Sequence, residues 1–346
     1  MKTTYHKHVL EFKRPSGTSR GVLKTKETWF LVVQDGARKG IGECGILRSL
    51  SIDDRPDYEK KLKWTCDHMH WGVERLWYEL KEYPSIQFGV EMAFKSLESL
   101  DPFLLFPSAF TLNQKTVPIN GLIWMGDKEF MKMQITEKLE AGFDCIKMKI
   151  GAIDFDTELA LLESIRDNFT KEIIELRVDA NGAFTPEEAL GKLERLSKFD
   201  LHSIEQPIGV QQYDAMKELC AATPLPIALD EELIGVFELK EKRQLLEKIK
   251  PQYIILKPSL IGGFRGTQEW ISIAEELGIV WWITSALESN VGLNAIAQFA
   301  FTLESILPQG LGTGSLYTNN FTAPLQVCQG ALGYDPLIAW DVPFIN

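Results

Sequence analysis

From residue 116 onward, short apolar segments alternate with longer amphipathic segments, and this pattern constrains the fold more than any other feature of the sequence. It predicts strands over 116–120, 145–149, 174–179, 201–205, 227–230, 253–257, 280–284 and 309–312. It predicts helices near 127–141, 157–169, 186–197, 212–222, 237–248, 264–277 and 292–303, and Thr185 and Pro186 mark one helix start. Eight strands with seven helices between them favour a TIM-type (β/α) barrel without one of its regular helices, with an open doubly wound sheet as the alternative.

The residues before 116 are organised differently. Alternating segments at 9–13 and 28–33 predict strands, a Gly/Ser-rich loop lies between them, and helices are predicted over 56–81 and 86–99. We therefore expect three parts. They are an α+β capping domain over 1–113, a (β/α) barrel catalytic domain over 114–322, and a C-terminal segment over 323–346 that packs back on the cap.

Charge and cysteine usage limit the function classes. The formal net charge is −11, from 37 basic and 48 acidic residues, which argues against nucleic-acid or anionic membrane partners but not against a small anionic substrate. Five scattered cysteines without a CxxC pair indicate neither a zinc site nor a disulfide framework, so a cytoplasmic location is expected. No membrane span is expected, and the sequence leaves the oligomeric state open.

Charged side chains recur where the predicted barrel strands end. The spacings from one to the next are 30, 26, 25 and 27, about one strand–helix unit each, for Lys149, Asp179, Glu205, Asp230 and Lys257. Active sites of such barrels lie at the carboxyl ends of the strands. We therefore expect these side chains at one height around a single pocket.

Lys147 joins this set because it lies two residues before Lys149, and residues i and i+2 of a strand share a face. Neighbouring ammonium groups repel, so each should make the other easier to deprotonate, as a lysine base requires. The competing interpretation is a pair of solvated lysines on an edge strand.

Three carboxylates at neighbouring strand ends predict a metal site. Asp179, Glu205 and Asp230 would repel one another strongly if they were unpaired in a partly buried site. Carboxylates suit Mg²⁺, with Mn²⁺ as a possible substitute, and the absence of histidine at these positions argues against zinc. Such a cation stabilises the enediolate that forms when a lysine removes a proton next to the carboxylate of a small-molecule substrate.

Five motifs together resemble the muconate-lactonizing-enzyme subgroup of the enolase superfamily. They are Lys147-Met148-Lys149, Val178-Asp179-Ala180-Asn181, Ile204-Glu205-Gln206-Pro207, Leu229-Asp230-Glu231 and Leu256-Lys257-Pro258. The resemblance covers nearly the whole chain and implies an enolase-like fold. It also implies that Asp179, Glu205 and Asp230 bind Mg²⁺, that Lys149 abstracts the proton, and that Lys257 is its counterpart on the opposite face.

Within this subgroup the chain is most similar to the o-succinylbenzoate synthase family, on the segments 261–263, 285–289 and 310–314, the last of which lacks the Asp-x-Asp of dipeptide epimerases. The resemblance implies a lyase of menaquinone synthesis that carries out the syn-dehydration of 2-succinyl-6-hydroxy-2,4-cyclohexadiene-1-carboxylate to 2-succinylbenzoate. Lys149 would return its proton to the departing hydroxyl, the ammonium of Lys257 would stabilise the enediolate, and Lys147 would add positive charge near the carboxylate.

Further residues are candidates for substrate binding. Backbone N–H groups of the glycine-rich segment 310–314 are suited to cradling an anion, although a flexible turn is an equal alternative. The candidates are Asn181, Ser285, Gly312, Thr313 and, in the loop of the cap, Arg20.

Other activities share the same motifs. N-succinylamino-acid racemases, dipeptide epimerases and cycloisomerases of the subgroup need the same metal and lysine pair, so the motifs do not separate them. A racemase uses both lysines as acid–base partners, whereas dehydration needs one base and one ammonium. The alternatives from other classes are a barrel that only binds a ligand and a phosphate-binding barrel enzyme; the latter leaves the lysine–carboxylate array unexplained.

Overall fold

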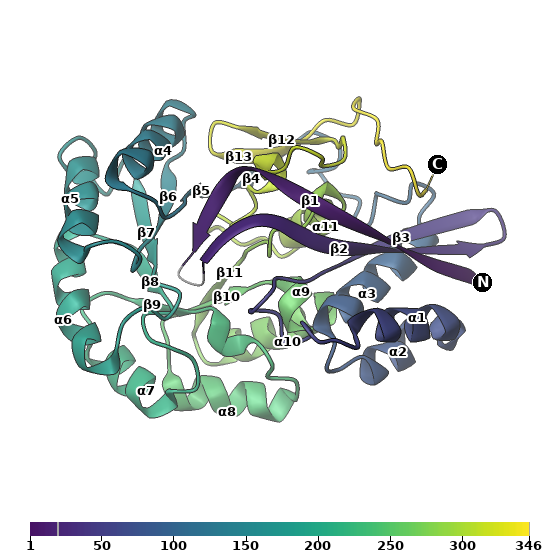
Figure 1. Ribbon diagram of the computed structural model, residues 1–346, viewed down its shortest axis with the longest axis horizontal. Helices are drawn as coiled ribbons and strands as arrows, with labels where there is room; N and C mark the ends of the chain where they lie inside the picture. Colours follow the sequence, from purple (N-terminus) through teal and green to yellow (C-terminus); the bar gives the residue numbers. More distant parts are fainter. Residues whose placement is uncertain (19–20, 346) are drawn as a thin grey trace.

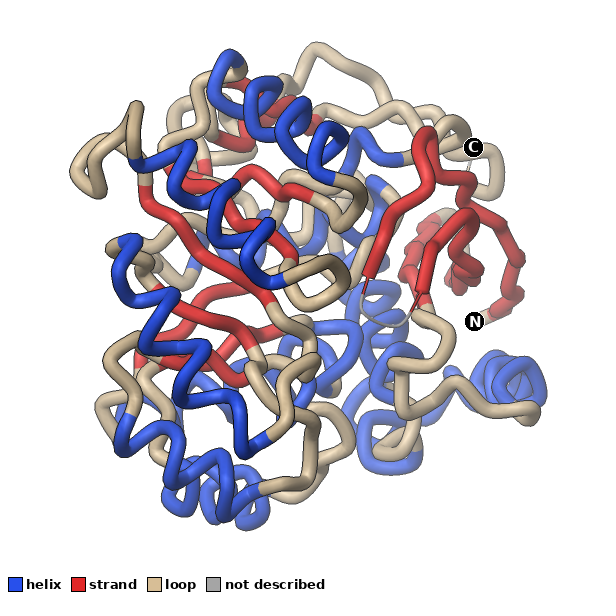
Figure 2. Tube along the Cα trace, turned by 60° about the vertical axis from the view of Figure 1, so that its left-hand side comes forward, coloured by secondary structure: helices blue, strands red, loops and turns tan. Residues whose placement is uncertain are grey.

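The computed structural model describes residues 1–18 and 21–345, and these residues form an antiparallel cap against a parallel barrel (Figure 1). Both chain termini lie on the side of the cap, and the helices of the barrel form an arc on the opposite side. Figure 2 shows the strands of the barrel enclosed by helices, with the long strands of the cap outside that enclosure.

The cap is a sheet with helices against one face. Its strands are antiparallel in the order β1 (Lys2–Thr18), β2 (Gly21–Asp35) and β3 (Arg38–Gly45). The helices are α1 (Tyr58–His68), η1 (Met69–Trp71), α2 (Val73–Glu79) and α3 (Pro84–Glu98). Helix α3 packs so closely on β3 that a Cβ at Gly42 would lie 1.8 Å from the backbone oxygen of Gly89. Only glycine permits that approach.

The barrel strands follow one another around a parallel sheet in chain order. They are β5 (Gly121–Ile123), β6 (Cys145–Lys149), β7 (Glu175–Asp179), β8 (Ser203–Glu205), β9 (Ile227–Leu229), β10 (Tyr253–Leu256) and β11 (Val280–Ile283). Parallel bridges from Gln309 to Ile119 and from Gly310 to Thr284 join the two edges, so the predicted strand at 309–312 is reduced to these bridges. A doubly wound sheet would reverse its strand order. The predicted TIM-type barrel with its cap is confirmed.

Helices alternate with the barrel strands along the chain. They are α4 (Lys128–Glu140), α5 (Phe155–Arg166), α6 (Pro186–Leu196), α7 (Tyr213–Ala222), α8 (Leu239–Ile249), α9 (Pro258–Ile261), α10 (Gly263–Glu276) and α11 (Asn290–Thr302). The short α9 among them contacts α3 of the cap. Short 3-10 turns lie at η2 (Ser197–Phe199), η3 (Glu231–Leu233) and η4 (Gly314–Leu316). Among the described residues no helix is long and apolar enough to cross a membrane.

The prediction of a first barrel strand over 116–120 is wrong. Residues Val117–Pro118 form β4, which pairs with β13 (Ala331–Tyr334) of the C-terminal hairpin, and the barrel strand begins at Gly121. The chain passes from one sheet to the other here. The N–H of Ile119 donates to the C-terminal hairpin at Gly330, whereas the N–H of Asn120 donates to Gln309 at the closure of the barrel.

The predicted helix over 56–81 is interrupted. Gly72 adopts a φ of 82°, which lies outside the helical range, and it separates η1 from α2. The glycine therefore ends one helical segment and begins the next.

The C-terminal segment contacts the cap. Its hairpin, β12 (Leu325–Cys328) and β13, lies against β4, and Phe344 stacks on Phe30 of β2 with ring centroids 5.1 Å apart. The largest apolar cluster continues through both parts, because Phe30 and Phe88 of the cap belong to the same cluster as Ile146 of β6. The cap and barrel therefore share a core.

Candidate active site

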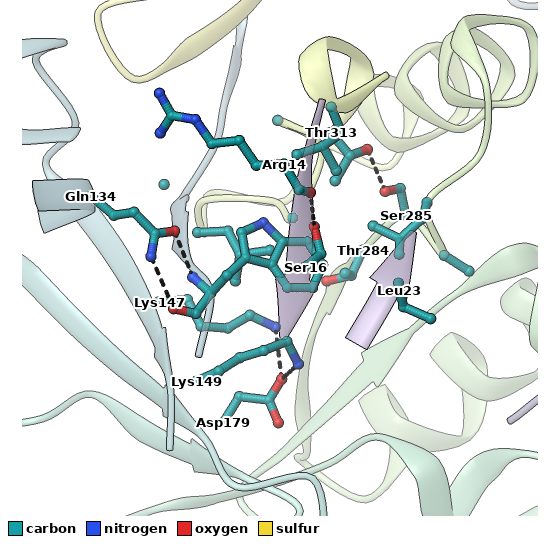
Figure 3. A pocket seen from close by; sticks show the side chains of 18 of the residues that line it. Arg14, Ser16, Leu23, Gln134, Lys147, Lys149, Asp179, Thr284, Ser285 and Thr313 are labelled. Atoms are coloured by element: carbon teal, nitrogen blue, oxygen red, sulfur yellow. Dashed lines mark hydrogen bonds and ion pairs between the residues drawn. The ribbon is translucent and has the colours of Figure 1, made fainter. Parts of the chain in front are cut away.

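A cavity of about 480 Å³ lies where the carboxyl ends of the barrel strands meet the β1–β2 hairpin of the cap (Figure 3). The cap contributes Arg14, Ser16 and Leu23 to its lining, and the barrel contributes most of the residues predicted to carry the chemistry. Those barrel residues are Lys147, Lys149, Asp179, Asn181, Lys257, Ser285, Gly312 and Thr313.

The register of the sheet sets three of the charged residues side by side. Lys149 of β6 pairs with Asp179 of β7, and Asp179 pairs with Glu205 of β8. Glu205 pairs with Ala228, so Asp230 lies two residues farther along the same face, just after β9. Lys257 follows β10. Lys149, Asp179 and Glu205 therefore share one height, whereas Asp230 lies farther along its strand because neighbouring strands of a tilted barrel are staggered.

Lysines and carboxylates alternate in this cluster. The Nζ atom of Lys147 lies 2.7 Å from Oε2 of Glu205 and 3.5 Å from Oδ2 of Asp179. The Nζ atom of Lys149 lies 2.7 Å from the same Oδ2 of Asp179, and Lys257 forms an ion pair with Asp230. The shared partner shows that Lys147 and Lys149 point to one face, into the cavity and not into open solvent (Figure 3).

The carboxylates control the protonation of the lysines. Burial lowers the pKa of Lys147, but the charges of Glu205 and Asp179 outweigh burial and raise that pKa. Burial also lowers the pKa of Lys257, and the charge of Asp230 overcomes it. The expectation that neighbouring lysines depress each other's pKa is therefore wrong for Lys147, because two carboxylates face its ammonium group.

Asp179 and Glu205 differ in the direction in which their pKa values are shifted. Burial raises the pKa of Asp179, but Lys149 and Lys147 outweigh it and hold that pKa well below its usual range. Burial raises the pKa of Glu205 to about 7, a rise that Lys147 opposes and Asp179 reinforces. The positive charge of the lysines therefore compensates burial less at Glu205 than at Asp179.

The chemistry of this donor set fits a hard divalent cation. Among the described residues no three His, Cys, Asp or Glu side chains group closely enough to hold a metal as they stand, and ammonium groups lie between the carboxylates. Oε1 of Glu205 is buried without a hydrogen-bond partner among those residues. A buried carboxylate oxygen without a partner is costly, and a bound cation would compensate it. The assignment of Asp179, Glu205 and Asp230 as metal ligands stays a prediction.

Asn181 positions the predicted base. Its backbone has a φ of 45°, which turns the chain sharply after β7. Its Oδ1 accepts a hydrogen bond from Nζ of Lys149 at 2.7 Å, and its Nδ2 donates to Glu231 at 2.9 Å. These contacts fix the ammonium of Lys149, and the predicted contact of Asn181 with substrate is untested.

The opposite wall carries a pair of hydroxyl groups. Ser285 Oγ and Thr313 Oγ1 lie 2.6 Å apart, and both residues are buried (Figure 3). Gly312 lines the same cavity. These three predicted residues therefore come together. Arg20 lies outside the described residues.

Two residues of the site were not singled out from the sequence. Gln206, with a φ of 38°, accepts hydrogen bonds from the N–H groups of Asp230 and Glu232 and donates to the Glu232 carboxylate, so it orders the segment after β9. Trp124 lines the cavity directly after β5, and its ring centroid lies 6.0 Å from Nζ of Lys149. Its strand-end position was hidden because the predicted strand ended at Asn120.

The fold and this arrangement of lysines and carboxylates define the class of protein. The family model for the enolase C-terminal domain-like family matches residues 131–334. The chain therefore belongs to that family. A dipeptide epimerase from Enterococcus faecalis, solved with Mg and the dipeptide L-Leu-L-Tyr, has a TM-score of 0.83 at 18% identity over 96% of each chain, which reflects the shared fold.

Within that class, the chain belongs to the o-succinylbenzoate synthase family. It is 45% identical to an o-succinylbenzoate synthase of Desulfotalea psychrophila, over 96% of this chain and 99% of the relative. The crystal structure of MenC from the same organism matches with a TM-score of 0.86 at 42% identity, over 96% of this chain and 99% of that one. The resemblance to this family, predicted from the segments 261–263, 285–289 and 310–314, is confirmed.

Proposed function

We propose that the chain is a Mg²⁺-dependent dehydratase that converts 2-succinyl-6-hydroxy-2,4-cyclohexadiene-1-carboxylate to 2-succinylbenzoate in menaquinone synthesis. The observation that carries this proposal is a pair of lysines that line one cavity, Lys149 and Lys257, each paired with one of three buried carboxylates at neighbouring strand ends. The near full-length relative named o-succinylbenzoate synthase supports the choice of reaction. A reducing cytoplasm is part of the proposal, because all five cysteines are free.

Lys149 is the proposed base. Its Nζ takes the proton from C1 of the substrate, the carbon that bears the carboxylate. Asp179 and Asn181 hold this Nζ from two sides, each at 2.7 Å, which restricts its direction of approach. A base fixed in this way avoids the entropic cost of orientation during the reaction.

The same lysine completes the elimination. As the C6–O bond breaks, the ammonium of Lys149 returns the proton to the departing hydroxyl on the same face of the ring, and water leaves. The electrons of the former C1–H bond form the C1–C6 double bond, which makes the ring aromatic. Lys257, which lines the cavity beside Asp230, acts as an ammonium and stabilises the enediolate from the opposite face.

The remaining residues of the site hold the two ends of the substrate. Asp179, Glu205 and Asp230 would bind Mg²⁺, which supplies positive charge for the enediolate carboxylate and neutralises the carboxylates that pair with the lysines. Lys147 adds charge at the same end. The hydroxyl pair of Ser285 and Thr313, with the backbone at Gly312, would bind the succinyl carboxylate.

A racemase or epimerase of the same subgroup is the second candidate. It is favoured by one observation, since both Lys149 and Lys257 line the cavity and a racemase needs a base on each face. Incubation with N-succinyl amino acids in deuterated water separates the two activities. Inversion with deuterium exchange supports the racemase.

The test of the dehydratase is ultraviolet-monitored turnover of the cyclohexadiene substrate with Mg²⁺. We expect metal-dependent loss of the diene absorbance that EDTA abolishes. Lys149→Ala should lower kcat by at least about a thousandfold, because it removes the general base that both proton transfers use. Lys198→Ala, which removes an exposed lysine of η2, is the matched control and should behave like the unaltered protein.

Two results would argue against this proposal. Absence of turnover by folded, metal-loaded protein would sink the dehydratase and favour the racemase or epimerase. Turnover that survives both EDTA and Lys149→Ala would mean that the lysine–carboxylate cluster is not the site of the reaction.

A further inference from the structure

The indole of Trp124 forms the wall of the cavity beside the proposed base. Its ring centroid lies 6.0 Å from Nζ of Lys149, and the side chain is only 8% exposed although it lines the cavity. The exposed part of a flat apolar ring therefore lies next to the atom that takes the proton, and the mechanism above assigns no role to this ring.

The backbone at Trp124 is held by a single buried side chain. The N–H of Trp124 donates to Oε1 of Gln134 at 2.9 Å, and Nε2 of Gln134 donates back to the carbonyl of Trp124 at 3.0 Å. Gln134 is itself 6% exposed and belongs to α4. This two-point contact fixes the direction in which the indole leaves the strand.

The indole is also packed from the cap. Trp124 belongs to an apolar cluster with Leu10 of β1, Leu287 after β11 and Tyr317 after η4. The hydroxyl of Tyr317 donates to the carbonyl of Leu287 at 2.7 Å, which holds two members of the cluster together. Contacts from both parts of the protein therefore leave the ring little freedom to rotate.

We propose that Trp124 is a specificity-determining residue that packs its face against the six-membered ring of the substrate and keeps water from Lys149; this inference rests on the proposed dehydratase function. A flat aromatic surface gains most from a flat partner. The substrate ring becomes fully planar as water leaves, so the contact strengthens along the reaction and favours the transition state.

This role gives the site a means of choosing among related substrates. An N-succinyl amino acid carries the same two carboxylates as the cyclohexadiene but has no ring. The metal site and the hydroxyl pair would hold both kinds of molecule by their charged ends. Only the ring-bearing molecule presents a flat surface to Trp124, so this residue should separate the two classes.

The experiment compares Trp124→Met and Trp124→Phe with the unaltered protein. Methionine keeps apolar volume but loses the flat face, whereas phenylalanine keeps a smaller one. The measurements are kcat/KM for the diene and the inhibition constants of 2-succinylbenzoate and N-succinylvaline. Phe169→Leu is the control, because it removes a partly buried aromatic ring after α5 that is not among the described residues lining the cavity.

We expect Trp124→Met to lower kcat/KM for the diene and to raise the inhibition constant of 2-succinylbenzoate by about tenfold. The inhibition constant of N-succinylvaline should change by less than about twofold. Trp124→Phe should give changes between those of Trp124→Met and the unaltered protein, and Phe169→Leu should not alter the ratio of the two inhibition constants. If Trp124→Met does not fold, Trp124→Phe decides, because its smaller face should still weaken the planar ligand more than the acyclic one.

Equal weakening of both ligands, or no change in either, would overturn the role of Trp124. The proposed function is judged separately, on turnover by the unaltered protein. Without that turnover the dehydratase fails, and calorimetric binding of the two ligands still shows whether Trp124 distinguishes a planar from an acyclic dicarboxylate. With turnover and an unchanged ratio of inhibition constants, only the inference about Trp124 fails.

Discussion

At the scale of single residues, Asn181 gives a test of how far positioning contributes to the proposed reaction. Asn181→Ala removes the Oδ1 acceptor of Lys149 and the link to Glu231 but leaves the base in place. We expect kcat to fall about ten- to a hundredfold with little change in KM, since misplacement of a reacting group acts mainly on the chemical step. Steady-state kinetics, with the exposed Asn168→Ala as control, measures this effect. A kcat like that of the unaltered protein would show that Asn181 is not needed to position Lys149.

The sequence could reveal the residues of the site that stand at regular positions on strands. Lys147 and Lys149 lie two residues apart on β6, so the alternation of side chains along a strand indicates that they share a face. Asp179 and Glu205 follow at intervals of about one strand–helix unit, so the repeat of the barrel predicts their neighbouring positions. Trp124 escaped because one strand boundary was misplaced. The role of Gln134 escaped because it depends on where α4 packs in three dimensions, which no local pattern of residues encodes.

At the scale of elements, local signals located most helices but not every junction. Thr185 and Pro186 marked the start of α6, and the structure shows a capping box between Thr185 and Glu188 there. By contrast, the predicted strand over 116–120 covered β4 and missed β5, because propensity cannot tell which of two sheets a strand will join. That choice is made by tertiary contacts with Gly330 and Gln309.

Helix α10 provides a prediction at this scale. Glu91 of α3 accepts hydrogen bonds from the N–H groups of Phe264 and Arg265 in its first turn. Burial raises the pKa of Glu91 from 4.5 to about 8, against the effect of these two hydrogen bonds. The folded protein therefore binds a proton between about pH 4.5 and 8 that the unfolded chain has lost, so stability is fully present below this window and falls as pH rises through it.

Thermal denaturation between pH 5 and 8 measures this linkage. Glu91→Gln should gain stability relative to the unaltered protein as pH rises, because glutamine takes up no proton. Glu98→Gln, on the exposed part of the same helix, is the control and should show a constant difference in Tm. A parallel pH dependence for Glu91→Gln and the unaltered protein would mean that Glu91 titrates normally.

At the scale of the whole molecule, one buried carboxylate connects the cap to the barrel above the site. Glu43 of β3 is fully buried, and its oxygens accept hydrogen bonds from the N–H groups of Ser289 and Gly292 at the start of α11, at 2.9 Å and 2.8 Å. They also accept from the hydroxyls of Ser289 and Thr28. A negative charge at a helix N-terminus is favourable, and here the charge and the helix come from different parts of the chain.

Because the same apolar core also runs through both parts, we expect the cap and barrel to unfold together and Glu43 to contribute to that shared stability. Glu43→Gln turns an amide N–H₂ toward groups that are themselves donors, so it should cost about 3 kcal/mol of unfolding free energy. Glu27→Gln is the control, because Glu27 pairs with Lys7 and Arg48 near the surface and its substitution should cost less than about 1 kcal/mol.

Calorimetry measures both the loss of unfolding free energy and the number of unfolding transitions. A single transition at lower temperature supports one cooperative unit, whereas a second transition in Glu43→Gln would show that this carboxylate, and not the shared core, couples the cap to the barrel.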